Sequence, residues 1–114
     1  MRKESEVLIS AKAKISNPDK WNKGSFARDK MGYEVTYKSP RAVCWCAMGA
    51  VASVQDGFSA KALFKVCPGK SSVAAYNDKP TTTHADIMKL FDDAIALAKL
   101  VEADETENNN QQVS

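Results

Sequence analysis

Three cysteines and one histidine are the residues of this chain with the clearest capacity for chemistry. Cys44 and Cys46 lie two residues apart, and His84 follows much later, at the start of a long amphipathic run. A cysteine nucleophile needs a lowered thiol pKa and a nearby base, and a helix N-terminus favours the thiolate. We predict a helix start at Ser39-Pro40, a hydroxyl cap followed by proline, which would place both cysteines in the first turns of that helix.

These residues would form a catalytic set if the chain is a thiol-dependent hydrolase or transferase. Cys46 would be the nucleophile and His84 its base, with Asn77 or Asp78 orienting the imidazole ring. Residues two apart on a helix point to nearly opposite sides, so Cys44 and Cys46 cannot both face His84 unless the helix begins later than predicted. The alternative is that the cysteine is a small core residue and the histidine a hydrogen-bonded one. We lean toward this non-enzymatic interpretation.

Four potential zinc ligands are present, but their spacing is poor. Three thiols and one imidazole would suffice for a tetrahedral site, from Cys44, Cys46, Cys67 and His84. Zinc ligands usually come in paired C-x-x-C knuckles, whereas here a C-x-C is followed by isolated residues. We keep a zinc-stabilised structural domain as a second alternative, and we predict no bound metal and no cofactor.

A polar turn before the last helix is a candidate binding surface. It comprises Tyr76, Asn77, Asp78, Thr83 and His84. Free backbone N–H groups at a helix start can bind an anion, although a turn and a helix cap explain the same residues. Trp21 is a candidate partner anchor, because tryptophan is enriched in interface hot spots, or else it fills the core. We predict that a partner is bound by segment 21–37 and by the turn at 76–84.

Hydrophobic periodicity predicts about four helices around one core. The predicted helices span residues 5–16, 39–55, 58–66 and 84–102, with a further helical turn at 73–76. Ser5 is the predicted cap of the first helix. Thr83 and Asp86 form a short capping box before the last helix, whose inner face carries Ile87, Phe91, Ala94, Ala98 and Val101.

A small β-hairpin is predicted between the first two long helices. Its arms are residues 26–29 and 33–37, around a turn at 30–32. The second arm alternates as a strand does and is rich in β-branched and aromatic residues. A hairpin alone is marginally stable, so we expect it to lie on the helices. The predicted fold is therefore α+β and mostly helical, with all-α as the alternative.

Composition indicates one globular domain in a reducing compartment. The 114 residues are 44% hydrophobic and 26% charged, which is ordinary for a globular chain. We predict a domain over residues 1–103 and a disordered acidic, Asn/Gln-rich tail over 104–114, which has almost nothing to bury. The odd number of cysteines implies no disulfide framework, and we see no secretory signal and no apolar run long enough for a membrane span. We therefore expect a cytoplasmic protein.

The charge distribution disfavours nucleic acid as a partner. The net charge is +2, and the first 41 residues carry ten Lys or Arg against five Asp or Glu. These cations are scattered among carboxylates, whereas a nucleic-acid footprint is usually a dense basic stripe. A protein partner or a small molecule is therefore favoured over nucleic acid, and the oligomeric state stays open.

Three motifs together resemble one known family. They are Trp45-Cys46-Ala47-Met48-Gly49-Ala50, then Tyr76-Asn77-Asp78-Lys79-Pro80 with Thr83-His84-Ala85-Asp86, then the run from Phe91 to Ala98. Their order and spacing, behind a Trp21-containing segment, are similar to those of an uncharacterised family of small bacterial and bacteriophage proteins, a domain of unknown function. The resemblance covers most of residues 5–100. It highlights Trp21, Cys46, Gly49, Asn77, Asp78, Thr83 and His84.

This chain departs from the family pattern at a few positions. Cys44 and Cys67 lie outside the pattern, which weakens the zinc alternative. Tyr76 stands where the family often has tryptophan, and Asp86 where it often has glutamate. The resemblance implies no activity. Our leading hypothesis is a small cytosolic binding or regulatory protein, phage-encoded if the resemblance extends that far, that acts on a host or phage target.

Overall fold

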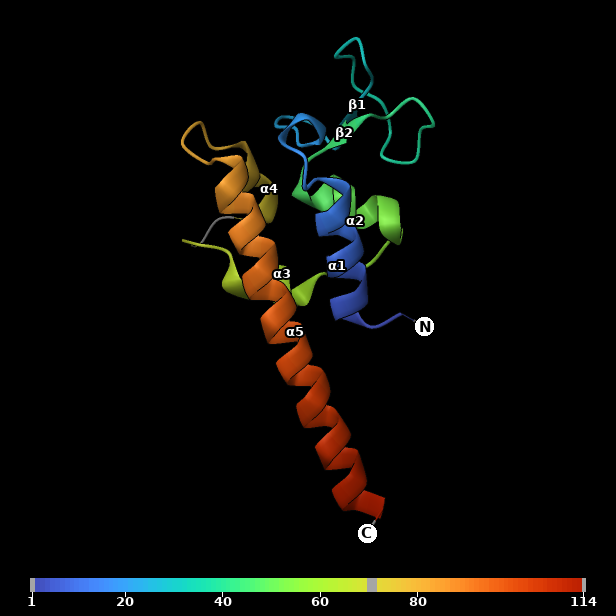
Figure 1. Ribbon diagram of the computed structural model, residues 1–114, viewed down its shortest axis with the longest axis vertical. Helices are drawn as coiled ribbons and strands as arrows, with labels where there is room; N and C mark the ends of the chain where they lie inside the picture. Colours follow the sequence, from blue (N-terminus) through green and yellow to red (C-terminus); the bar gives the residue numbers. More distant parts are fainter. Residues whose placement is uncertain (1, 70–71, 114) are drawn as a thin grey trace.

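The computed structural model describes residues 2–69 and 72–113, and it describes side chains up to residue 104. Within that part the elements are α1 (Glu4–Lys14), η1 (Pro18–Lys20), β1 (Ala27–Arg28), β2 (Cys44–Trp45), α2 (Ala47–Val54), α3 (Lys61–Val66), α4 (Val73–Asp78) and α5 (His84–Val113). The helices form the body, the two strands and their loops lie at one end, and α5 extends from the other end (Figure 1). The predicted mostly helical α+β fold is confirmed.

The core lies where α1 packs against α2 and α5, with α3 also against α5. Its largest fully buried side chains include Leu8, Ile15, Leu63, Ile87 and Phe91. Burying such a side chain contributes about 1.5–3 kcal/mol, so these helices hold one another in place. None of the described helices has the length and hydropathy of a membrane span.

The first helix is capped differently from the prediction. Its N-cap is Lys3, which makes no side-chain cap, and Ser5 lies inside the helix. The backbone N and the Oγ of Ser5 instead donate to the carboxylate of Glu102, over 3.0 and 2.7 Å. A carboxylate at a helix N-terminus satisfies unpaired N–H groups and complements the helix dipole. A side chain of α5 therefore caps α1.

The last helix begins as predicted. The Asp86 N–H donates to Thr83 Oγ1 over 3.1 Å, and the Thr83 N–H donates to Asp86 Oδ2 over 2.9 Å. Four of the five predicted inward residues are buried, whereas Val101 is 44% exposed. Glu102 faces α1 at this level of α5. Val101 precedes it and lies about 100° around the helix axis, so the Val101 side chain points away from α1.

The second helix begins at Ala47 and not at Ser39-Pro40. The Ser39 hydroxyl accepts the Arg41 N–H over 3.1 Å, which makes a local turn. Cys46 is the N-cap, and its Sγ accepts the Gly49 N–H over 3.3 Å. The prediction failed because the preceding residues pair with β1, and that long-range pairing outweighs a local start signal.

The sheet also differs from the predicted hairpin. β1 pairs antiparallel with β2, with Ala27 opposite Trp45 and Arg28 opposite Cys44. The predicted second arm lies on the other edge of β1, joined by an isolated Arg28–Glu34 bridge and by a Val35 N–H bond to the Ala27 carbonyl. The turn between these arms is present, but β1 lies between two neighbours rather than at the edge of a hairpin.

Other boundaries differ by less. The third helix is shorter than predicted, and the predicted helical turn is the complete helix α4. The backbone of α5 continues to Val113, beyond the predicted end near residue 102. Most side chains of the predicted tail lie outside the described residues, so the division into a domain over 1–103 and a disordered tail over 104–114 stays a prediction.

Candidate functional site

Asn77 joins three segments of the chain. Its side chain is fully buried in α4, and its Oδ1 accepts the Trp21 indole N–H over 2.7 Å and the Ala47 N–H over 3.1 Å. Its Nδ2 donates to the Asn22 carbonyl and to Asp78 Oδ1, both over 3.0 Å. An amide has two donors and two acceptor positions, and all four are used. Asn77 therefore acts as a structural link and does not orient His84.

His84 links the start of α5 to the end of α1. Its Nε2 lies 2.7 Å from the Ile15 carbonyl oxygen, and a carbonyl only accepts, so Nε2 donates. Its ring centroid lies 5.9 Å from that of Trp21, with the planes tilted by 58°. The ring nitrogen in this bond carries its proton and cannot act as a base there.

Cys46 is a buried thiol whose pKa is raised. It is 4% exposed. Burial raises the thiol pKa, the N–H groups of Gly49 and Met48 lower it only in part, and the Asp78 carboxylate raises it again. No hydrogen bond joins Cys46 to His84 among the described residues. The direct thiol–imidazole hydrogen bond expected of an activated cysteine nucleophile is therefore not formed among the described residues, and the catalytic role of Cys46 and His84 stays a prediction.

Alkylation should show this low reactivity. At neutral pH we expect Cys46 to react with iodoacetamide more slowly than an unfolded thiol, because burial reduces both its access and its thiolate fraction. Its rate–pH profile should be displaced to higher pH. The half-buried Cys44 serves as the internal comparison. Time-resolved peptide mass spectrometry measures both, and reaction of Cys46 at or above the rate of an unfolded thiol would contradict this description.

The zinc alternative has no ligand set in the described part of the chain. There, no three His, Cys, Asp or Glu side chains lie together as a metal site would require. The Cys44 thiol instead lies 3.9 Å from the Arg28 carbonyl oxygen, and Cys67 follows the end of α3. The four candidate ligands are Cys44, Cys46, Cys67 and His84. They do not lie together around one point.

The polar turn is closed by its own hydrogen bonds. The Thr82 hydroxyl donates to the Tyr76 carbonyl over 2.7 Å. Burial raises the pKa of the Tyr76 phenol, which is half-buried against the core. Thr83 and Asp86 occupy each other's N–H groups in the capping box. The two capping-box bonds use backbone N–H donors that an anion at this helix start would need.

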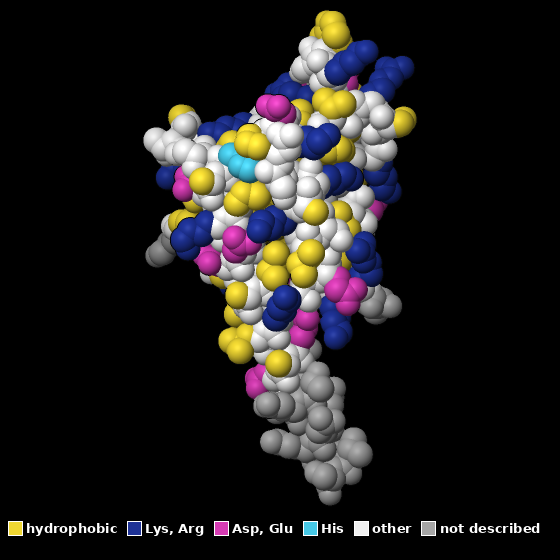
Figure 2. Space-filling model, viewed as in Figure 1, with side chains coloured by type: hydrophobic (Ala, Val, Ile, Leu, Met, Phe, Trp, Pro, Cys, Tyr) yellow, Lys and Arg dark blue, Asp and Glu magenta, His cyan; other side chains and the backbone are white. Residues whose placement is uncertain are grey.

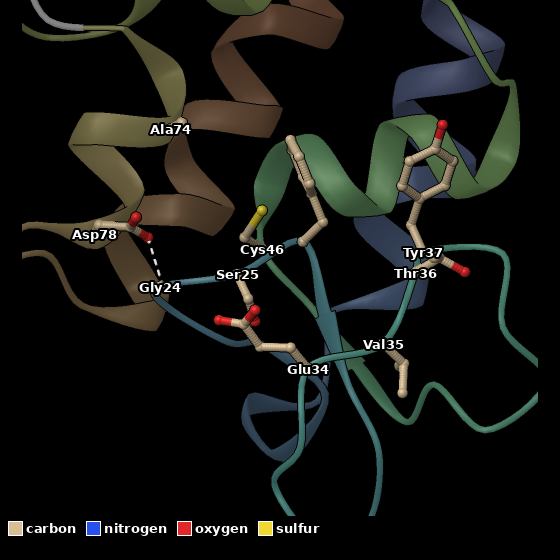
Figure 3. A pocket seen from close by; sticks show the side chains of 10 residues that line it. Gly24, Ser25, Glu34, Val35, Thr36, Tyr37, Cys46, Ala74 and Asp78 are labelled. Atoms are coloured by element: carbon tan, nitrogen blue, oxygen red, sulfur yellow. Dashed lines mark hydrogen bonds between the residues drawn. The ribbon is translucent and has the colours of Figure 1, made fainter.

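A pocket of about 660 Å³ lies between the β1 region and α4. It is lined by Gly24, Ser25, Phe26, Glu34, Val35, Thr36, Tyr37, Cys46, Ala74 and Asp78. Figure 3 shows the Cys46 sulfur directed between α4 and the opposite wall, and Asp78 hydrogen-bonded to Gly24. Of the side chains singled out in the sequence, this pocket brings together Cys46 and Asp78.

Hydrogen bonds from backbone N–H groups hold the segments around this pocket together. The Gly24 N–H donates to Asp78 Oδ1 over 2.9 Å, and the Cys46 N–H donates to the Phe26 carbonyl over 3.3 Å. A Cβ on Gly49 would lie 2.0 Å from that carbonyl oxygen, so only glycine permits the approach. Gly49 of the motif around Cys46 therefore lets α2 approach the backbone of Phe26, the residue before β1.

A model described as a family of unknown function (DUF6197) matches residues 1–97. The chain belongs to this family. No curated protein and no solved structure matches the chain. The DUF6197 match confirms the family resemblance and spans every pocket residue, while the bacterial and bacteriophage range stays a prediction.

Sequence reasoning did not single out most of the pocket of this DUF6197 member. Seven of the ten lining residues lie within segment 21–37, which was predicted to bind a partner with Trp21 as its anchor. The individual contributions of Phe26, Glu34 and Tyr37 were missed. The sequence signal for this pocket was the pair of aromatic side chains, Phe26 and Tyr37, in a stretch without regular periodicity. Aromatic residues in such a stretch have no helix or strand face that would bury them, so they can line an exposed site.

Proposed function

We propose that this protein is a small cytoplasmic binding protein of a bacterial or phage-infected cell, and that it holds its ligand in the pocket beside α4. The pocket itself carries the proposal. Its volume of about 660 Å³ lies within the usual range for ligand sites, and its walls combine apolar side chains with a few polar groups. Regulation of a host or phage target would follow from occupancy of this pocket.

Binding is favoured over catalysis by the state of the polar groups. The Cys46 thiol accepts the Gly49 N–H and has a raised pKa, and His84 is engaged with the Ile15 carbonyl. The other polar groups on the side chains that line the pocket are two carboxylates and three hydroxyls, from Glu34, Asp78, Ser25, Thr36 and Tyr37. A rigid frame with such groups suits recognition, because pre-formed sites lose less entropy when a ligand binds.

Filling the pocket should abolish binding. Ala74 is an exposed pocket residue on α4, so Ala74→Trp places an indole at the pocket without disturbing the core. The matched control is Ala75→Trp, on the same helix and exposed but outside the lining. We expect phenyl-bearing fragments to shift the backbone amide NMR signals of Gly24, Ser25 and Thr36 in the parent and in the control, and not in Ala74→Trp.

The fragment panel holds one neutral, one cationic and one anionic member: 2-phenylethanol, phenethylamine and 3-phenylpropanoate. Thermal unfolding of both tryptophan variants checks that each is folded. The proposal fails if no member of the panel moves the pocket amide signals at millimolar concentration. It also fails if Ala74→Trp, while folded, responds as the parent does.

A further inference from the structure

We infer that the pocket selects a small apolar molecule that carries an ammonium or guanidinium group; this rests on the proposed binding function. The ten lining residues include two acids, Glu34 and Asp78, and no Lys or Arg. The remaining walls are mainly apolar or aromatic. A ligand complementary to this lining has an apolar body and a positive charge.

Two aromatic rings supply the apolar wall. Phe26 is 52% exposed, and its ring meets that of Tyr37 edge to face, with centroids 6.1 Å apart and planes at 82°. The Tyr37 hydroxyl donates to Asp56, which fixes the orientation of that ring. Figure 3 shows the hydroxyl pointing away from the labelled carboxylates. Aromatic faces also attract cations, so this wall favours the same ligand as the acids do.

Both carboxylates retain capacity for a cation. Asp78 Oδ1 accepts the Gly24 N–H and an Asn77 Nδ2–H, whereas its Oδ2 has no hydrogen bond within the described residues. The Glu34 carboxylate likewise forms no hydrogen bond or ion pair there. In Figure 3 the Glu34 side chain extends toward Ser25, on the side of the pocket where Asp78 lies.

Three basic residues next to lining residues in the chain or a few positions from them have partners outside the pocket lining. Arg28 donates to Asn22 Oδ1 and to the Gly32 carbonyl. Lys23 donates to a backbone carbonyl and lies over the Trp21 ring, and Lys38 pairs with Asp56. On the face shown in Figure 2, basic side chains are interspersed with acidic and apolar ones. The carboxylates of the pocket are therefore not neutralised by a basic lining residue.

The occupant is assigned as a small molecule because of the size of the site. A pocket of about 660 Å³ lies within the size range of sites that hold a whole compact ligand, and filling it takes a molecule larger than one basic side chain. A basic peptide segment is the competing occupant, and the experiment includes it.

The test compares the three phenyl-bearing probes by NMR titration of the full chain. Phenethylamine should bind at least about tenfold more tightly than 2-phenylethanol, the effect expected of one charge-assisted hydrogen bond. The anion 3-phenylpropanoate should bind most weakly. The preference should shrink when the salt concentration is raised from about 0.05 M to about 0.5 M, because salt screens exposed charges.

Isosteric variants separate the charge from the shape of the pocket. In the double variant Glu34→Gln, Asp78→Asn, the preference for the amine should disappear while 2-phenylethanol binds as before. The control removes two exposed acids outside the pocket lining, Glu6→Gln with Asp104→Asn, and should keep the preference.

The outcomes distinguish this inference from the proposed function. If 2-phenylethanol or 3-phenylpropanoate binds as tightly as phenethylamine, selection of a cation is wrong although the pocket still binds. If no probe moves the pocket signals, both are wrong. If an acetylated Phe-Lys dipeptide amide binds more than about tenfold more tightly than phenethylamine, the occupant is a basic peptide segment and the small-molecule assignment is overturned.

Discussion

Asn77→Ala is expected to lower the free energy of unfolding by about 3–5 kcal/mol, since each buried polar group left unpaired costs about 1–3 kcal/mol. The substitution removes the acceptor of the Trp21 indole N–H and of the Ala47 N–H, and the donor to the Asn22 carbonyl. Asn77 is fully buried, so the groups that lose it face the space of the deleted amide and not bulk water. For a chain of this length, that is a large share of the total stability.

Urea unfolding followed by tryptophan fluorescence measures this loss. The control is Asp78→Asn, at the next residue, which keeps an oxygen for the Gly24 N–H and should change stability by less than about 1 kcal/mol. A double-mutant cycle with Trp21→Phe should be non-additive by about 1 kcal/mol or more, because the two side chains share one bond. Additive effects, or a cost no larger than that of Asp78→Asn, would show that the network does not link these segments.

Gly49→Ala is expected to destabilise the fold by about 3 kcal/mol or more, at or above the upper end of ordinary overpacking. The added Cβ would lie 2.0 Å from the Phe26 carbonyl oxygen and 2.8 Å from its carbon. These are backbone atoms, which cannot rotate away as a side chain can. The junction of α2 with β1 must separate, and the hydrogen bond from the Cys46 N–H to the same carbonyl is then lost.

Gly32→Ala is the matched control for this substitution. Gly32 has a φ of +87°, and a Cβ added there would have no neighbouring atom within 4 Å, so alanine meets only backbone strain. That strain costs about 1–2 kcal/mol. Chemical unfolding of both variants should rank Gly49→Ala as clearly the more damaging. Equal losses would mean that the contact with Phe26 relaxes at little cost.

Both substitutions also bear on the pocket, because they act on its frame. Asn77 precedes Asp78 in α4, and Gly49 sets how closely α2 approaches the backbone of Phe26. Two opposite walls therefore depend on residues that do not line the cavity. This arrangement explains how Gly49 and Asn77 support the proposed binding pocket without lining it.

Sequence alone determined the parts of the fold that depend on local pattern. The apolar period of α5 and the Thr83–Asp86 capping box involve residues within a few positions of one another, and both are present. The sequence also resembles an uncharacterised family, and the match over residues 1–97 shows that the chain belongs to a family of unknown function. Helix periodicity and capping act over one or two turns, so a single sequence carries their signal.

Only the tertiary structure decided where α2 begins and what the candidate site contains. The pairing of Ala27 with Trp45 turned the predicted first turns of a helix into a strand and made Cys46 a cap. Asn77 is a buried link because Trp21 and Ala47 reach it from distant parts of the chain. Such contacts join residues 18 to 56 positions apart, and no local spacing encodes them. The pocket exists only because these long-range contacts bring segment 24–37 against α4, a placement that packing decides.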